Sequence, residues 1–139
     1  MKISTRGRYA LRFFIYLASQ NNDKVSLKEV ALHEEISMKY LEQIVPNLAK
    51  DKLIYSTRGA KGGYSLTKNP SEYCVLEILE SVEGKMEVVS CVNKTGTASC
   101  HRLFKCKTAP LWKGLTKHIV DYLKGVTLED LLINENEYL

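Results

Sequence analysis

Residues 58–64 read RGAKGGY, a run with two cations and three glycines between two short apolar segments. Glycine permits positive φ angles and close approach of the backbone to another molecule, while Arg58 and Lys61 carry positive charge at the tip. A hairpin of this kind suits a phosphate-lined surface. The same residues also suit a solvated hairpin loop, so the flanking sequence must separate the two interpretations.

Two helical patterns with capping signals precede this run. Residues 26–29, SLKE, form a capping box and predict a short helix that ends near Glu34. After a tight connection at residues 35–36, Ser37 is in position to cap a third helix, whose apolar residues recur at helical spacing. Two short capped helices joined in this way predict a helix-turn-helix.

Pro46 falls inside the third predicted helix. Because proline lacks the N–H that would bond to the Glu42 carbonyl and clashes with that carbonyl, we expect the helix to kink or break there. The polar side chains that face outward all precede Pro46, so the predicted reading face is preserved. They are Lys39, Tyr40, Glu42 and Gln43.

The surrounding pattern predicts a mainly α fold with one small β-hairpin. Residues 53–57 and 64–67 are strand candidates on either side of the glycine-rich run, and residues 8–20 have the wide apolar stripe of a core helix. A helix-turn-helix followed by a basic hairpin is a winged helix. A further helix over about residues 75–82, closed by Gly84, follows it.

The last part of the chain predicts a long helix that needs a partner. Periodicity fades between residues 85 and 107, after which Thr108 caps a helix with Pro110 near its first turn. A small domain would not easily cover the apolar seam of this helix, which predicts a second copy of the chain as its partner. The seam consists of Trp112, Leu115, Ile119, Tyr122 and Leu123.

Domain organisation and charge follow the same division. We predict a winged helix-turn-helix DNA-binding domain over residues 1–70 and a cysteine-containing loop with dimerisation helices over residues 71–139. Through Lys68 there are 12 basic and 6 acidic residues, whereas from Asn69 onward 8 basic residues face 10 acidic ones. A basic first half indicates a module that binds a polyanion, with nucleic acid as the leading candidate.

Other functional classes are disfavoured. No segment approaches the roughly 20 apolar residues that cross a bilayer, and the N-terminal apolar stretch contains Arg8 and Arg12 without a cleavage-site pattern. We therefore expect a cytoplasmic protein with no membrane partner. A thiol redox enzyme would need a Cys-x-x-Cys pair or an evident nucleophile, base and orienting group, and the sequence offers neither. We therefore expect no enzymatic activity.

Three of the four cysteines lie close together in the aperiodic segment. They are Cys91, Cys100 and Cys106, with His101 adjacent to the second. Because disulfides are rare in cytoplasmic proteins, a close group of this kind indicates metal binding or redox sensing. Free thiols and a zinc site are the alternatives. Cys74 lies on a helix that we expect to be buried, where it would serve as a small hydrophobe.

In the order of these motifs the chain resembles the Rrf2 family of bacterial winged-helix repressors, which has IscR, NsrR and CymR branches. The matching segments span nearly the whole length: residues 1–11, 36–44, 58–64, 111–112 and 127–131. The resemblance implies a homodimeric transcription regulator. Its two reading helices would enter successive major grooves of a pseudo-palindromic operator in double-stranded DNA.

The resemblance also implies roles for individual residues at the DNA. Gln43 would pair with adenine and Glu42 would accept from cytosine N4, whereas Lys39 and Tyr40 would hold phosphate. Arg58 matches a wing residue that enters the minor groove, where a narrow A·T-rich tract favours guanidinium. The alternative for the helix face is a solvated amphipathic surface. The complete expected set is Ser37, Lys39, Tyr40, Glu42, Gln43, Arg58, Lys61, Gly62 and Gly63.

For the cysteines, the resemblance implies an iron-sulfur cluster. The IscR and NsrR branches carry three cluster-ligating cysteines in this region, before a Leu-Trp pair, and the CymR branch lacks them. The expected ligands are thus Cys91, Cys100 and Cys106 of an iron-sulfur cluster, a 2Fe–2S cluster in the first place and 4Fe–4S as the alternative. Such a regulator would sense iron-sulfur status or redox or nitrosative stress. The alternative is a cluster-free, thiol- or metabolite-responsive repressor of the same fold that a partner protein regulates.

Two features depart from those branches. The first two cysteines are farther apart here. At the positions where the two branches supply a fourth ligand, this chain has Ala109 and Arg8. The fourth ligand is therefore open among His101, a group from the partner subunit and a small molecule.

Overall fold

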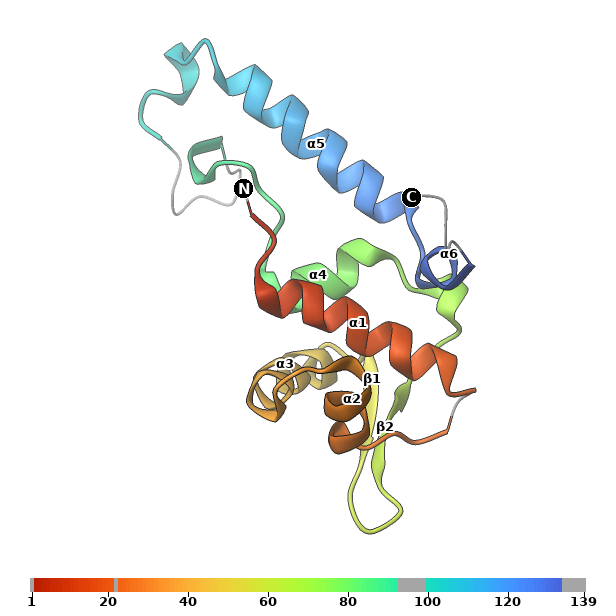
Figure 1. Cartoon of the computed structure of the whole chain (residues 1–139). Helices are drawn as coiled ribbons and strands as arrows, with labels where there is room; N and C mark the ends of the chain where they lie inside the picture. The colour runs from red at the N-terminus through yellow and green to blue at the C-terminus, as the bar shows by residue number, and fades with distance from the viewer. Residues whose placement is uncertain (1, 22, 93–99, 134–139) are drawn as a thin grey trace.

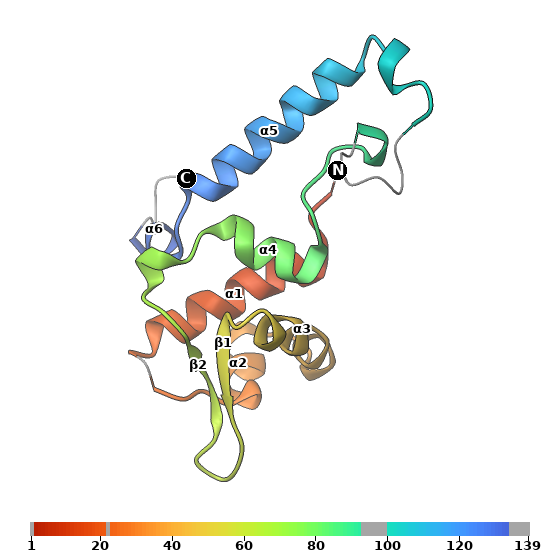
Figure 2. The same ribbon diagram turned by 180° about the vertical axis from the view of Figure 1, so that it is seen from behind.

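The computed structural model describes residues 2–21, 23–92 and 100–133. The chain forms a helical body with a two-stranded antiparallel hairpin, and a long helix lies at the end of the molecule opposite the hairpin (Figures 1 and 2). This architecture confirms the mainly α fold class with a β-hairpin wing. The elements are α1 (Thr5–Ser19), α2 (Leu27–Glu34), α3 (Met38–Lys50), β1 (Ile54–Thr57), β2 (Gly63–Leu66), η1 (Pro70–Glu72), α4 (Val75–Glu83), η2 (Ser90–Val92), η3 (Leu103–Lys105), α5 (Ala109–Gly125) and α6 (Leu128–Ile133), where η denotes a short 3-10 helix.

Helix α1 begins at Thr5, earlier than the predicted start at residue 8. The Ser4 hydroxyl caps it by accepting a hydrogen bond from the Gly7 N–H at 3.3 Å. Glu83 of α4 supplies a second acceptor, because its Oε1 lies 2.9 Å from the Ser4 nitrogen and 3.1 Å from the Gly7 nitrogen. A carboxylate distant in sequence thus completes the first turn, which explains why local periodicity placed the start too late.

Helices α2 and α3 form the predicted helix-turn-helix. Ser26 and Glu29 make both bonds of the capping box, at 3.1 and 3.3 Å. Glu35 then turns the chain with a φ of 53°. Ser37 directly precedes α3 but makes no side-chain capping hydrogen bond, so the expected hydroxyl cap is wrong.

Helix α3 continues through Pro46 to Lys50, so the break considered at Pro46 does not occur. Pro46 and Glu42 are both exposed, and water can therefore satisfy the Glu42 carbonyl that proline leaves without a donor. Buried side chains on the opposite face hold both halves of the helix on the core. They are Leu41, Ile44, Val45 and Leu48.

The hairpin confirms the predicted strands to within one residue. Strands β1 and β2 pair from Ile54 opposite Leu66 to Thr57 opposite Gly63. Tyr64 also pairs with Val25: the Val25 N–H donates to the Tyr64 carbonyl at 2.9 Å and the Tyr64 N–H donates to the Val25 carbonyl at 2.8 Å. The wing is therefore anchored to the segment that leads into α2.

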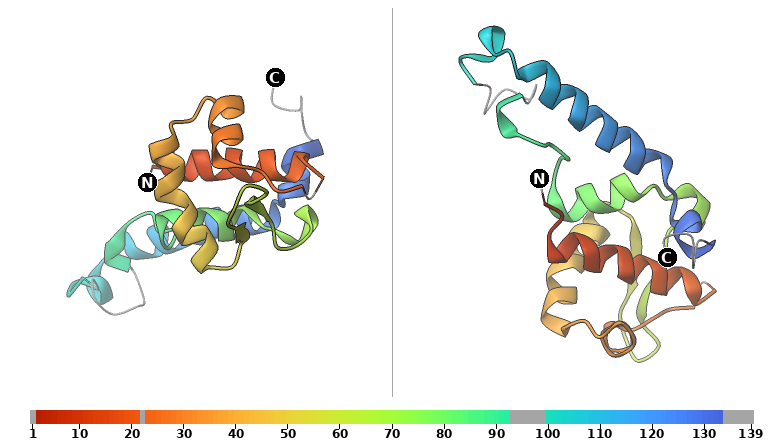
Figure 3. Two further views of the ribbon diagram at one scale, coloured as in Figure 1. Left: turned by 90° about the horizontal axis from the view of Figure 1, so that it is seen from below. Right: turned by 45° about the horizontal axis from the view of Figure 1, so that its top comes forward.

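The main hydrophobic core joins the helix-turn-helix to α4 and α6. Helices α1 and α4 lie side by side (Figures 1 and 2), and the α2, α3 and hairpin end of the molecule faces the viewer when it is seen from below (Figure 3, left). Tyr73 is fully buried and its hydroxyl donates to the Leu53 carbonyl at 2.7 Å. Leu128 of α6 is also fully buried in this core. Side chains from both sides of residue 70 share the core, and the functional division at that residue stays a prediction.

Helix α5 begins at Ala109 with Pro110 in its first turn, as predicted. Thr108 makes no side-chain capping bond, in contrast to the expectation. Part of the apolar seam is exposed in the single chain: Leu115 is 42% and Tyr122 64% exposed. The described parts of the segment between α4 and α5 contain only short 3-10 turns, as the loss of periodicity predicted.

Helix α6 has only six residues, too few for periodicity to reveal it. Its start is fixed by two reciprocal hydrogen bonds. The Thr127 N–H donates to the Asp130 carboxylate at 2.8 Å, and the Asp130 N–H donates to the Thr127 hydroxyl at 3.1 Å. This pair places Leu128 in the core.

Candidate nucleic-acid interface

The predicted reading face lies on the exposed side of α3. Its members Lys39, Tyr40, Glu42 and Gln43 are all exposed, as is Ser37 just before the helix. Lys39, Tyr40 and Gln43 together line a hollow of about 250 Å³. The fold therefore brings these three predicted contacts into one small surface that is accessible to base edges or phosphates.

Helix α1 positions Tyr40. The Tyr40 ring meets Tyr9 edge-on, with ring centroids 5.6 Å apart and planes at 83°. The Arg12 guanidinium lies 5.6 Å from the centroid of Tyr9. Arg12 Nε is also 3.1 Å from Glu34 Oε2, and another guanidinium nitrogen donates to the Glu34 carbonyl. Tyr9, Arg12 and Glu34 could not be predicted from the sequence as supports of the reading face, because no local pattern signals a contact between helices.

A groove between α2 and the wing connects the two predicted DNA-binding elements. It measures about 580 Å³, and its lining includes both Met38, the first residue of α3, and Arg58 of the wing. Lys28 and the hydroxyl-bearing Ser56 and Thr57 line it as well. Ammonium, guanidinium and hydroxyl groups in one groove suit phosphate oxygens.

Lys28, Ser56 and Thr57 are candidate DNA contacts that were not predicted from the sequence. A weak signal was available, since Lys28 is in the first turn of a capped helix and the other two directly precede Arg58. Their common position depends on the pairing of Val25 with the wing, which sets the hairpin against α2. That pairing joins residues far apart in sequence, and no sequence motif predicts it.

Two glycines of the wing lie where the backbone packs closely against other backbone atoms of the same chain. Gly63 has a φ of +151°, and a Cβ there would lie 2.7 Å from the Val25 carbonyl oxygen. A Cβ on Gly62 would overlap the Thr57 carbonyl oxygen. Gly59 has a φ of 104°, which also favours glycine. Direct contact of Gly62 and Gly63 with DNA stays a prediction.

Both cations of the wing are accessible. Arg58 and Lys61 are exposed, and within the described part of the chain neither belongs to a salt bridge. The hairpin that carries them extends beyond the helical body (Figure 1). Their charge is therefore available to an external polyanion.

The cysteine-containing segment between α4 and α5 lies at the end of the molecule away from the wing (Figure 1). Cys91 is exposed, whereas Cys100 and Cys106 are half-buried. The Cys100 N–H donates to the Cys91 carbonyl at 3.4 Å. The Leu103 N–H donates to the Cys100 carbonyl at 2.9 Å, and the Cys106 N–H donates to the Leu103 carbonyl at 3.3 Å. These turns gather the backbones of the three cysteines in one region.

The side chains do not converge on a point. Among residues 2–21, 23–92 and 100–133, no three His, Cys, Asp or Glu side chains form a group that could hold a metal ion. The donor set nevertheless fits an iron-sulfur cluster in its chemistry, because three thiols on one loop supply soft, anionic ligands. Hydrogen bonding to the Thr108 hydroxyl, 3.2 Å from Cys106 Sγ, lowers the pKa of the Cys106 thiol and favours its thiolate.

The positions considered for a fourth ligand, and the fourth cysteine, have ordinary surroundings. His101 is exposed beside Cys100, and Ala109 is buried at the start of α5. Arg8 is exposed and donates to the Thr5 hydroxyl at 3.1 Å. Cys74 directly precedes α4 and is half-buried, which is less burial than we expected.

Comparison with known proteins places the chain in a family. The Rrf2 family, described as an iron-dependent transcriptional regulator, matches residues 3–134. The chain belongs to the Rrf2 family. One Rrf2 relative, the HTH-type transcriptional regulator IscR of Pectobacterium atrosepticum, is 33% identical over 136 residues, which cover 97% of this chain and 81% of the relative.

Solved Rrf2 structures resemble this one over nearly the whole chain. CymR, the global cysteine regulator of B. subtilis, has a TM-score of 0.77 and 33% identity, and the match covers 98% of this chain and 99% of CymR. T. potens IscR has a TM-score of 0.76 and 31% identity, covering 99% and 90%. The chain is thus a DNA-binding winged-helix transcription regulator. Relatives named as regulators agree with the expectation that it is not an enzyme.

None of the helices within the described residues combines the length and the apolar character that a membrane crossing requires.

Proposed function

We propose that this Rrf2 protein is a dimeric regulator that reads a pseudo-palindromic operator with α3 and the wing, and that an iron-sulfur cluster held by its cysteines sets its operator affinity. The groove lined by both Met38 and Arg58 carries the first part of the proposal. It joins the start of the reading helix to the wing in one cationic, hydroxyl-rich surface. A DNA backbone in this groove would place α3 beside the base edges.

Each exposed residue of this surface has a role that its chemistry allows. Gln43 offers an amide for adenine, and Glu42 offers an acceptor for cytosine N4. Lys39 and Tyr40 would hold phosphate, with Tyr40 oriented by its edge-on contact with Tyr9. Arg58 would enter the minor groove from the wing.

Helix α5 supports a dimer. Leu111, Leu115 and Tyr122 are exposed on it although each is large and apolar. Covering such side chains with the same helix of a second copy removes apolar area from water, at roughly 25 cal/mol per Å². A two-fold dimer would present two reading helices to half-sites about one DNA turn apart.

Cys91, Cys100 and Cys106 would hold the cluster, which when bound supplies a redox-sensitive group at the base of α5. The chain connects this segment to the reading face through packed elements. Helix α4 precedes the segment and packs on α1, and α1 orients Tyr40 through Tyr9. A rearrangement of the cysteine segment would therefore reach the DNA-binding surface through α4 and α1.

The second candidate is a thiol-responsive or metabolite-responsive regulator of the same fold without a cluster, with regulation by a partner protein. The exposure of Cys91 favours it, because an accessible thiol is open to direct oxidation. Replacement of all three cysteines by alanine in cells bears on both candidates. Unchanged regulation in that strain would exclude every mechanism that uses these thiols.

The cluster is tested by anaerobic isolation of the full chain. We expect a coloured protein with visible absorption, bound iron and sulfide, and loss of all three signals in the variant without Cys91, Cys100 and Cys106. A colourless, iron-free protein after anaerobic reconstitution would reject the cluster.

A further inference from the structure

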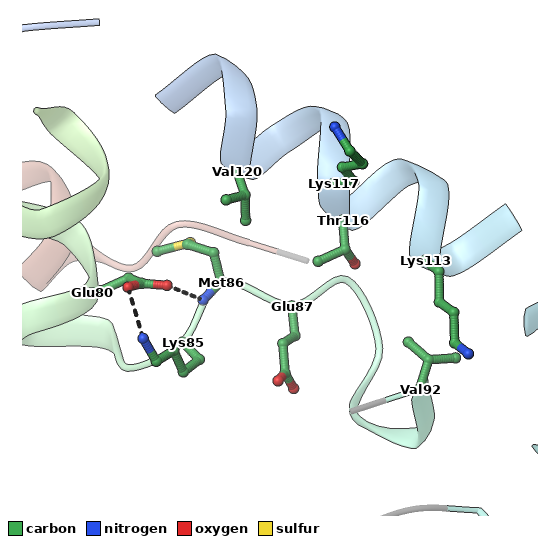
Figure 4. A pocket seen from close by; sticks show the side chains of 9 residues that line it. All are labelled: Glu80, Lys85, Met86, Glu87, Val92, Lys113, Thr116, Lys117 and Val120. Carbon is green, nitrogen blue, oxygen red and sulfur yellow. Dashed lines mark hydrogen bonds and ion pairs between the residues drawn. The ribbon is translucent and has the colours of Figure 1, made fainter. Parts of the chain in front are cut away.

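A cavity of about 420 Å³ lies between α5 and the chain that follows α4 (Figure 4). Its volume is within the range of about 300–1,000 Å³ that is typical of small-molecule sites. Thr116 and Val120 of α5 form one wall, and the segment from Lys85 to Val92 forms the other. The cavity shares no lining residue with the hollow at the reading face or with the wing groove, and Val92 in its wall directly follows Cys91.

The middle of this cavity is apolar and preformed. Met86 and Val92 are buried, at 6% and 8% exposure, and both line it together with Val120. The Val88 N–H donates to the Thr116 hydroxyl at 3.3 Å, which fixes the loop against α5. A ligand would therefore meet apolar side chains here without having to open the loop.

Most charged side chains around the cavity form salt bridges within the protein. One carboxylate oxygen of Glu80 lies 3.3 Å from Lys85 Nζ, and the other accepts a hydrogen bond from the Met86 N–H at 3.2 Å (Figure 4). Lys117 pairs with Asp121, one turn farther along α5. These contacts neutralise Glu80 and direct Lys117 along its own helix.

Two charged side chains remain. In Figure 4, Glu87 is turned away from α5, whereas Lys113 extends from α5 toward Val92. Lys113 is exposed, and among the described residues it takes part in no salt bridge. The cavity thus has at one end the ammonium group of Lys113, which no salt bridge within the described residues engages, and at the other an apolar surface formed by Met86 and Val120.

We propose that this cavity binds a small organic anion with an apolar body, such as a medium-chain carboxylate. The anionic head would pair with Lys113, and the apolar body would cover Met86 and Val120. An inorganic anion would leave the apolar wall exposed to water, and an amine would place like charge beside Lys113. Occupancy would hold the loop that leads to Cys91 against the helix that follows Cys106. The site does not depend on a cluster.

Titration of the full-length protein with hexanoate tests this site. Isothermal titration calorimetry follows this binding through its heat change. We expect a saturable change with hexanoate, and no saturable change with sulfate or hexylammonium at the same ionic strength. Absence of saturation with hexanoate, or an equal response to sulfate or to hexylammonium, would overturn the proposal.

Three folded variants, checked by circular dichroism, locate the binding. Lys113→Gln should weaken hexanoate binding by about tenfold, the effect of losing one charge-assisted hydrogen bond. Val120→Phe should weaken it by filling the apolar end while leaving all charges in place. Lys117→Gln, on the same helix, should bind like the wild type because this ammonium is directed to Asp121. Wild-type affinity in Lys113→Gln, or a loss in Lys117→Gln as large as in Lys113→Gln, would contradict the assignment.

Discussion

Glu83 of α4 accepts a hydrogen bond from the backbone N–H of Gly7 in α1, with its Oε1 3.1 Å from the nitrogen. The same oxygen accepts bonds from the N–H and the hydroxyl of Ser4. Its negative charge complements the positive end of the α1 dipole. Since α1 also supports Tyr40 through Tyr9, one carboxylate joins the helix that leads to the cysteines to the helix that supports the reading face.

This contact explains a glycine inside a helix and makes it testable. A Cβ on residue 7 would lie 2.6 Å from Glu83 Oε1. Gly7→Ala should therefore lower the free energy of unfolding by about 1–2 kcal/mol, through the hydrogen bonds it disturbs. Urea denaturation measures this change.

Gly125→Ala is the matched control, because a Cβ at this exposed position at the end of α5 has nothing within 4 Å. It should leave stability unchanged or raise it by up to about 1 kcal/mol, since alanine is the better helix former. Stabilisation of Gly7→Ala to the same extent would show that the Glu83 contact is not restrictive.

The wing offers a second glycine pair. Gly63→Ala should cost about 2 kcal/mol and weaken DNA binding, because its Cβ would meet the Val25 carbonyl oxygen at 2.7 Å and displace the hairpin from α2. Gly59 also has a positive φ, but a Cβ there would have no atom within 4 Å. Gly59→Ala should therefore lower the free energy of unfolding by only about 1 kcal/mol. Unfolding and DNA-binding titrations of both variants measure the difference, and equal costs would refute the role of the Val25 contact.

These contacts also show what the sequence could predict. The capping box of residues 26–29 and the glycine-rich hairpin are local signals, in which a few adjacent residues satisfy one another's backbone groups, and both appear in the structure. The Glu83–Gly7 and Tyr9–Tyr40 contacts join elements far apart in sequence, so periodicity does not predict them.

The same distinction explains which features around the candidate site could not be predicted from the sequence. The polar face of α3 was visible from helical spacing, but the groove residues Lys28 and Ser56 meet only because Val25 pairs with the wing. A break of α3 at Pro46 was one of the two outcomes expected from local chemistry alone. The exposed position of Pro46 and the buried stripe on the opposite face let the helix continue.

The two wing cations should differ in their effects on DNA binding. Arg58→Ala should weaken binding most on operators with A·T-rich flanks, because a narrow minor groove favours guanidinium. Lys61→Ala should weaken binding evenly across sequences and reduce the salt dependence by about one phosphate contact. Fluorescence anisotropy at several salt concentrations measures both effects. Wild-type binding by both variants would remove the wing from the interface.

Acid should loosen α6. Hydrogen bonding to the Thr127 backbone N–H, and secondly to its hydroxyl, lowers the pKa of Asp130. A carboxyl with a lowered folded-state pKa stabilises the fold above its unfolded pKa of about 3.9, and that contribution is lost as the pH falls through the folded value. The stability difference between wild type and Asp130→Asn should therefore be constant from about pH 7 to 5 and shrink below about pH 4. A difference that stays constant down to pH 3 would contradict this role.

In the proposed mechanism, the cysteine segment sets operator affinity. An operator selected from random duplexes allows one direct measurement: its affinity for anaerobically isolated wild type compared with the variant in which Cys91, Cys100 and Cys106 are alanine. We predict affinities that differ by at least about tenfold, which is a typical size for allosteric coupling. Equal affinities, with iron and sulfide present in the wild type, would contradict it.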